Sequence, residues 1–207
     1  FVYSTNDKPA KLTLLGNKFE NMKEIIGTIN LTRSGGDELV VSNNTSKNNI
    51  KNGVSFNGSI DIDTSLNNIG SNIPYIISDL RVNKGSTLDI VAGTILKVED
   101  GVMLGYKSGI QNYGTLNLKG TSRNKVVVTS IKDDSAAGDT DGNNISTVER
   151  GDWGNISYKK GSNGTIEYSD IKYGGDLIEQ CSVGGSGNIT IKNSNIKYSS
   201  ENGIGVG

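Results

Sequence analysis

The chain has 207 residues, enough for one large domain or two small ones. Only 33% of the residues are hydrophobic and 28 are glycine, which excludes a thick globular core and favours a thin, elongated one. Lys and Arg number 21 against 22 Asp and Glu, so a net charge of −1 gives no indication of a nucleic-acid partner. No apolar run approaches the ~18–20 residues needed for membrane insertion.

Residues 1–72 are expected to form an N-terminal cap or an irregular β region. Apolar residues at helical spacing predict a short helix near residues 18–26. Asn17 is placed as its N-cap, with Glu20 three residues later, and Gly27 stands where a C-terminal cap belongs. We expect this helix to cover the exposed end of a stack of strands. Whether residues 1–72 belong to that stack is left open by the sequence.

A five-residue pattern recurs through the chain: glycine, a small polar residue, an aliphatic residue, a polar residue, then an aliphatic residue or tyrosine. The copies begin at Gly27, Gly58, Gly114, Gly154, Gly164 and Gly187. Each is a turn residue followed by alternation of apolar and polar residues, which predicts a short strand with one buried face.

The repeat length indicates a solenoid. The strand after Gly164 is repeated 23 residues later (187 − 164) by the strand after Gly187, and Ser169–Tyr173 is repeated 25 residues later (194 − 169) by Ser194–Tyr198. Repeats of this length are typical of solenoids, and the alternation excludes helical ones. The sequence therefore predicts an all-β fold, a right-handed parallel β-helix over residues 73–207. The last residues resemble a strand in progress, so we expect the β-helix to continue beyond this fragment.

Residues 73–175 resemble a family of bacterial secreted and cell-surface proteins with right-handed parallel β-helix repeats. The resemblance is carried by segments 82–94, 128–142, 151–154 and 171–175. It covers about half of the chain and implies the fold and a secreted or cell-surface location. Most members of the family have no assigned function, so the resemblance implies no activity.

An insertion from Lys132 to Asp152 interrupts the strand pattern and is the best candidate site. It carries six acids against two bases, so its local charge is strongly negative. Ca²⁺ takes six to eight oxygen ligands, and Asp139–Asn143 has the Asp-x-Asp-Gly character of a calcium loop, without the glutamate of an EF-hand. The predicted metal ligands are Asp133, Asp134, Asp139, Asp141 and Asn143. The alternative is a solvated acidic loop closed by its own hydrogen bonds.

Aromatic residues beside this insertion suggest a second candidate site. Trp153, Asp152 and Tyr158 are the candidate ligand-binding residues, because a tryptophan beside acids can stack on a sugar ring. The alternative, which we favour, is that Trp153 packs as a lid on the core. Tyrosines that end successive strands are likewise expected to form an internal or edge ladder more readily than a glycan platform.

Two functions remain open. The first is a non-catalytic extracellular or cell-surface module, a scaffold or adhesin that binds glycans on a long face and can associate end to end. The second is a calcium-dependent polysaccharide lyase, with Lys132 or Arg150 as base beside the acidic loop. The chain has no histidine, which excludes Ser–His–Asp and Cys–His chemistry. Cys181, the only cysteine, excludes an internal disulfide and is expected to be a small apolar filler.

Overall fold

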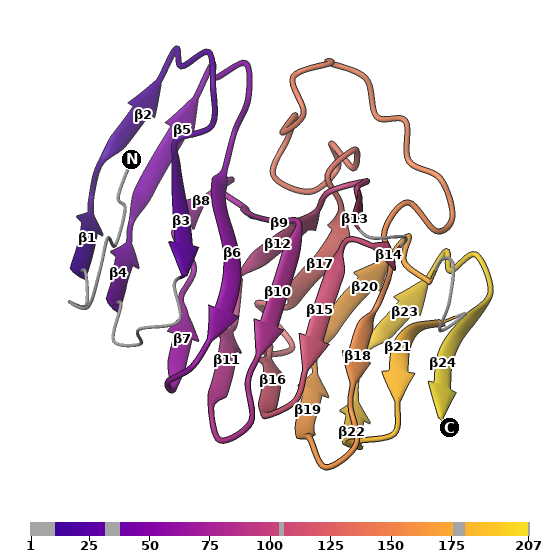
Figure 1. Ribbon diagram of the computed structural model, residues 1–207. Helices are drawn as coiled ribbons and strands as arrows, with labels where there is room; N and C mark the ends of the chain where they lie inside the picture. The colour runs from indigo at the N-terminus through magenta and orange to yellow at the C-terminus, as the bar shows by residue number, and fades with distance from the viewer. Residues whose placement is uncertain (1–10, 32–37, 104–105, 176–180, 207) are drawn as a thin grey trace.

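The computed structural model describes residues 11–31, 38–103, 106–175 and 181–206, and these residues form strands and turns with no helix (Figure 1). No helix of the length and apolar character needed to cross a membrane occurs in these ranges. The N-terminal strands are β1 (Lys11–Leu15), β2 (Lys18–Glu20), β3 (Gly27–Leu31), β4 (Glu38–Ser42), β5 (Asn44–Lys47), β6 (Val54–Ile60), β7 (Thr64–Leu66) and β8 (Gly70–Ser71).

From residue 75 onward the chain winds through three faces in a fixed order. The first face contains β9 (Tyr75–Ile77), β12 (Ile95–Val98), β17 (Val126–Ser130), β20 (Ser169–Lys172) and β23 (Asn195–Lys197). The second contains β10 (Asp79–Val82), β15 (Gly109–Asn112), β18 (Ile156–Tyr158), β21 (Cys181–Gly185) and β24 (Asn202–Val206). The third contains β7, β11 (Thr87–Val91), β16 (Thr115–Lys119), β19 (Asn163–Glu167) and β22 (Asn188–Lys192). One passage through the three faces is one coil.

Every pairing between successive coils is parallel, so the predicted parallel solenoid architecture is confirmed. The first and second faces are two arms of one 12-stranded sheet that diverge at β6. The start of β6 pairs with β9 and its end pairs with β10, and Gly58, at φ 107°, is the first residue of the half that pairs with β10. Strands β1 to β3 and β22 to β24 lie at opposite ends of the stack (Figure 1).

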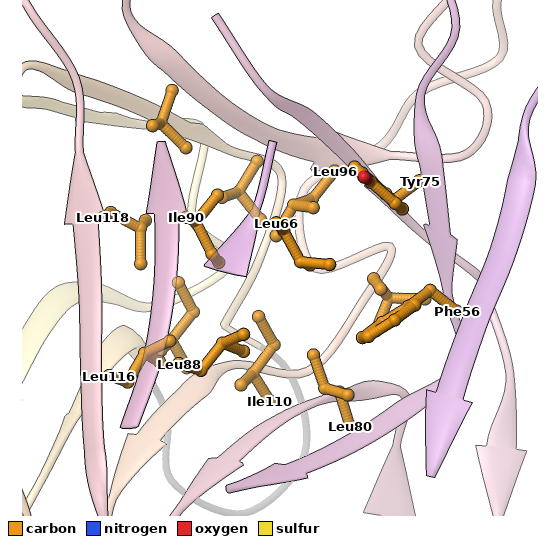
Figure 2. Packing of buried hydrophobic residues seen from close by; sticks show 14 of the residues in the cluster. Phe56, Leu66, Tyr75, Leu80, Leu88, Ile90, Leu96, Ile110, Leu116 and Leu118 are labelled. Atoms are coloured by element: carbon orange, nitrogen blue, oxygen red, sulfur yellow. The ribbon is translucent and has the colours of Figure 1, made fainter. Parts of the chain in front are cut away.

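The core is a narrow apolar column inside the three faces. On the third face, Leu88 lies opposite Leu116, and Ile90 lies opposite Leu118, all of them fully buried. Figure 2 shows these side chains pointing into the same interior as Leu80 and Ile110 from the second face. Alternation of apolar and polar residues along each strand therefore places like side chains over one another from coil to coil.

The predicted helix at residues 18–26 is not present. Residues 18–20 form β2, which pairs in parallel with β5, and bends and irregular backbone follow up to β3. Asn17 does not act as a helix cap, because its backbone amide donates to the Asn44 side chain in the next coil, at 2.9 Å. Phe19 and Ile26 pack against the core from these extended segments. Pairing with the neighbouring coil supplies the backbone partners that a helix would have supplied locally.

Strands from the N-terminal region, residues 1–72, join the later stack directly. β3 pairs with β6 along its whole length, and both belong to the 12-stranded sheet of the later coils. Two short sheets, β1 with β4 and β2 with β5 and β8, complete the N-terminal part. The division at residue 72 between cap and β-helix stays a prediction.

Two segments extend out of the coils at the corner between the first and second faces. The antiparallel pair β13 (Val102–Met103) and β14 (Tyr106–Lys107) follows β12. One coil later, the predicted insertion lies between the end of β17 and the start of β18. The coil that contains it takes the chain from Ile110 to its partner Ile156, whereas the next coil takes it only from Ile156 to Val183.

Candidate metal site in the acidic insertion

The acidic insertion folds back across the first face and covers its outward side. The ammonium group of Lys97 on β12 donates to the carbonyl of Gly138, at 2.6 Å. Farther along the face, the side chain of Asn52 donates to the carbonyl of Ala137, at 3.3 Å. Lys97 is 0% exposed although its strand position points it away from the core.

Three of the predicted metal ligands come together in the insertion. Carboxylate oxygens of Asp134, Asp139 and Asp141 all lie within 4.8 Å of one another. Asp139 accepts hydrogen bonds from the backbone amides of Gly142, at 2.7 Å, and Asn144, at 2.8 Å. These bonds fix the turn that holds Asp139 and Asp141 side by side. The cluster supplies hard oxygen donors of the kind that Ca²⁺ prefers.

Asn143 belongs to the same turn and bonds to one of the clustered acids, and its role as a metal ligand stays a prediction. Its side-chain amide donates to Asp141 at 2.8 Å, and its side-chain oxygen accepts the backbone amide of Ile145 at 2.7 Å. The polar groups of Asn143 therefore orient Asp141 and close the turn.

The electrostatics of the cluster favour a positive charge among the acids. Burial raises the pKa of Asp134, and the neighbouring charge of Asp139 raises it further. The pKa of Asp141 is also raised, first by burial and then by Asp139. Lys97 is the covered cation beside them: burial lowers its pKa to about 8, while the surrounding aspartates oppose that shift. Either the buried ammonium of Lys97 or a metal ion can therefore balance the negative charge of these carboxylates.

Asp133 lies apart from this cluster and has its own partners. Its carboxylate is 2% exposed, pairs with Lys172 at 2.7 Å, and accepts hydrogen bonds from Thr129 at 2.6 Å and Ser135 at 2.5 Å. Burial would raise the pKa of Asp133, but the bonds from Lys172, Ser135 and Thr129 outweigh it and hold the pKa below its usual value. In this structure Asp133 ties the insertion to β17 and β20, and its role as a metal ligand stays a prediction.

Lys132, which was predicted as a base, forms ion pairs with two carboxylates. Its ammonium lies 2.6 Å from Asp100, which leads into the preceding hairpin, and 3.1 Å from Asp152. The hydrogen bond to Asp100 raises the pKa of Lys132, and the bond to Asp152 adds to that effect. The guanidinium of Arg150 instead donates to the carbonyl of Ser199, at 3.3 Å. A protonated, ion-paired lysine is a poor general base.

The predicted ligand-binding residues Trp153, Asp152 and Tyr158 are covered. Trp153 and Tyr158 are both 0% exposed, and Asp152 is 4% exposed. The indole of Trp153 donates to the carbonyl of Lys172 at 2.8 Å, and the phenol of Tyr158 donates to the carbonyl of Leu116 at 3.1 Å. The buried rings present no face to a sugar in this structure, and the ligand-binding role of these residues stays a prediction. Core packing accounts for both rings.

The tyrosine ladder forms at a corner of the stack. Tyr173 and Tyr198 follow the ends of β20 and β23 and stack with ring centroids 5.0 Å apart and planes 15° apart. Both adopt positive φ, at 64° and 58°, which is unusual for a bulky residue and marks equivalent corners of successive coils. The side chain of Cys181 lies outside the described part of the chain, so its predicted role is not addressed.

Two lysines that complete the site were missed by sequence analysis. Lys97 alternates with Leu96 and Val98, a pattern that predicts an exposed side chain, and only the fold-back of the insertion covers it. Lys172 meets Asp133 from the following coil, far along the sequence. No family model, curated protein or solved structure matches this chain, so the resemblance to the bacterial β-helix repeat family stays a prediction.

Proposed function

We propose that this chain is a non-catalytic, secreted or cell-surface β-helix module that acts as a rigid scaffold or adhesin. The observation that carries the proposal is the unbroken parallel pairing of each face, from β7 to β22 on the third face and from β9 to β23 on the first. Solenoids of this kind derive stability from contacts between neighbouring coils and present long, regular surfaces. Right-handed winding is part of the proposal and follows from the strong preference of parallel crossovers for that hand.

The site supports a structural role for the insertion better than a catalytic one. Glycoside hydrolysis needs two carboxylates held on either side of a bond, and lyase chemistry needs an accessible base. The basic groups around the acids are engaged: Lys97 is buried, and Lys132 pairs with two carboxylates. These contacts pin the insertion to the preceding coil, and the pair of Asp133 with Lys172 pins it to the following one.

We further propose that Asp134, Asp139 and Asp141 can hold a structural Ca²⁺. The donor chemistry fits, and the raised pKa values of Asp134 and Asp141 indicate that the carboxylates gain from a nearby positive charge. Addition of Ca²⁺ to metal-free protein should raise its melting temperature, and Asp139→Asn should remove that increase. Asp89→Asn, a carboxylate on the third face, is the control and should leave the increase intact. A melting temperature that is insensitive to Ca²⁺ would contradict the proposal.

The lyase alternative is tested directly by turnover. The protein is incubated with polygalacturonate and with alginate in the presence of Ca²⁺, and ultraviolet absorbance of unsaturated products is followed. The non-catalytic role predicts no sustained product formation. Product formation that is lost in Asp139→Ala would overturn it. In the organism that encodes the chain, antibodies raised against it should label intact cells or the culture medium.

A further inference from the structure

The third face carries a groove that neither the insertion nor the core explains. It has a volume of about 540 Å³ and crosses β16, β19 and β22. Each of the three strands contributes one threonine and one asparagine to its lining: Thr115, Asn117, Asn163, Thr165, Asn188 and Thr190. Gly164, Gly187 and Ile189 complete the lining. The insertion covers Lys97 on β12 and Thr129 on β17 of the first face, whereas these outward side chains of the third face remain partly or fully exposed.

The groove is chemically regular along the axis of the stack. Asn117, Thr165 and Thr190 lie in one outward row, because each pairs with the next in the ladder. Thr115, Asn163 and Asn188 form the row beside it. Strands in a sheet lie about 4.8 Å apart, so three coils present the same kind of group over about 10 Å. A repeating surface of this kind suits a repeating ligand.

The amides of the groove are held in place while threonine hydroxyls remain available. Asn117 donates to Asp89 at 2.8 Å and accepts the backbone amide of Thr165 at 3.1 Å. Asn188 donates to Asn163 at 3.2 Å. Within the described ranges, no hydrogen bond occupies the hydroxyls of Thr115, Thr165 or Thr190. Each hydroxyl can both donate and accept, which matches the hydroxyl groups of a sugar.

The charge of the groove selects among glycans. All its lining residues are uncharged. The next outward row alternates in sign, with Lys119 opposite Glu167 and Glu167 opposite Lys192, and so provides no field of one sign. A polyuronate would lose hydration of its carboxylates here without gaining a paired cation. Within the groove, β16 and β19 are paired on both sides, so a peptide could add as a strand only beyond β22, at the end of the sheet.

We propose that this groove binds a neutral, hydroxyl-rich polysaccharide that runs along the axis of the stack, with successive sugar rings on successive coils. The inference rests on the proposed role as a non-catalytic module and names the ligand class of its exposed face. Threonine hydroxyls bind the sugar hydroxyls, and the ordered asparagine amides set the spacing. The acidic insertion takes no part in this binding.

The test uses the full chain labelled with ¹⁵N and four probes: cellohexaose, xylohexaose, mannohexaose and hexagalacturonate. At least one neutral hexaose should shift the backbone amides of Thr165 and Thr190. In the double variant Thr165→Val, Thr190→Val, affinity for that hexaose should fall by about tenfold or more, since each net hydrogen bond contributes a few-fold. Thr165→Ser keeps a hydroxyl and should retain binding. Thr45→Val makes the same change at an exposed position of β5, in another sheet and outside the groove, and should change affinity by less than about twofold.

The outcomes separate this inference from the proposed function. The inference is overturned if no neutral hexaose shifts the groove amides at millimolar concentration, if hexagalacturonate binds more tightly, or if Thr45→Val loses as much affinity as the double variant. Each incubation is also assayed for new reducing ends and unsaturated products. Absence of both binding and turnover removes the groove as a glycan site and leaves the scaffold role standing. Turnover would instead overturn the non-catalytic role itself.

Discussion

The phenol ring of Tyr158 occupies the space that a side chain at Gly164 would need. A Cβ built on Gly164 would lie 2.5 Å from the ring carbon Cε1 of Tyr158 and would also overlap the carbonyl oxygen of Leu116. The same carbonyl accepts the hydrogen bond of the Tyr158 hydroxyl. Tyr158 thus replaces the aliphatic side chain missing from the inner column of the third face.

Gly164→Ala should therefore destabilise the protein. Neither the buried ring nor the backbone carbonyl can move away without disturbing β16, so we expect a loss of about 1–3 kcal/mol in the free energy of unfolding. Chemical denaturation measures this loss. Gly27→Ala is the matched control: a Cβ there meets no atom within 4 Å, and the variant should be near neutral. Equal losses in both variants would show that Gly164 is not specially constrained.

The register between β19 and β22 differs from the one suggested by the sequence repeat. Aligning Gly164 with Gly187 would place Ile166 opposite Ile189, but Ile166 lies opposite Ile191. Ile189 lies opposite Gly164 instead. A shift by two residues keeps every side chain on its own face, so the alternation of apolar and polar residues cannot detect it.

Paired cysteines distinguish these two registers. In a chain with Cys181→Ser, the pair Thr165→Cys and Thr190→Cys should oxidise readily, because the two residues lie directly opposite each other. The pair Thr165→Cys and Asn188→Cys tests the register that aligns the two glycines and should oxidise more slowly. The measurement is the rate of disulfide formation in the folded protein, read by thiol titration. Faster closure of the second pair would contradict the register described here.

How far sequence predicts this molecule depends on the range of the contacts involved. Alternation within each strand and the repeat length predicted the parallel coils, because both are local consequences of one buried face. The prediction of a helix at residues 18–26 is wrong, because helical spacing of apolar residues carries no information about strand pairing with β5 in the next coil. The insertion was recognised by its acids. The sequence does not reveal the separate role of Asp133, because that role depends on an ion pair with Lys172 in the following coil.

Asp133→Asn should destabilise the fold strongly. The change leaves the ammonium of Lys172 without its partner at a largely covered position, and loss of one member of such a pair costs about 3 kcal/mol. Asp134→Asn, one residue along in the insertion, is the control; it relieves repulsion among the clustered acids and should cost much less. Urea titration at neutral pH compares the two variants. Similar losses for both would contradict a distinct anchoring role for Asp133.

The ion pair of Asp133 with Lys172 also predicts that stability depends on pH in acidic solution. The pKa of Asp133 is lowered in the folded state, so its contribution is present above the ordinary carboxyl pKa and is lost as the pH falls through the folded value. The free energy difference between wild type and Asp133→Asn should shrink as the solution is acidified through that range. A difference that stays constant down to strongly acidic pH would show that the Asp133 carboxylate is not stabilised by folding.

Lys97 should make stability rise with pH in the same direction, but in alkaline solution. Burial lowers its folded-state pKa to about 8, whereas the pKa of an unfolded lysine is near 10.4. Between these values the unfolded chain binds more protons than the folded one, so the contribution of Lys97 to stability rises with pH. Relative to Lys97→Met, wild type should gain stability from about pH 8 to about pH 10. Lys84, which is exposed, serves as the control, and Lys84→Met should show no such trend. If the Lys97→Met difference is flat across this range, the ammonium is hydrated in solution and the insertion does not cover the first face.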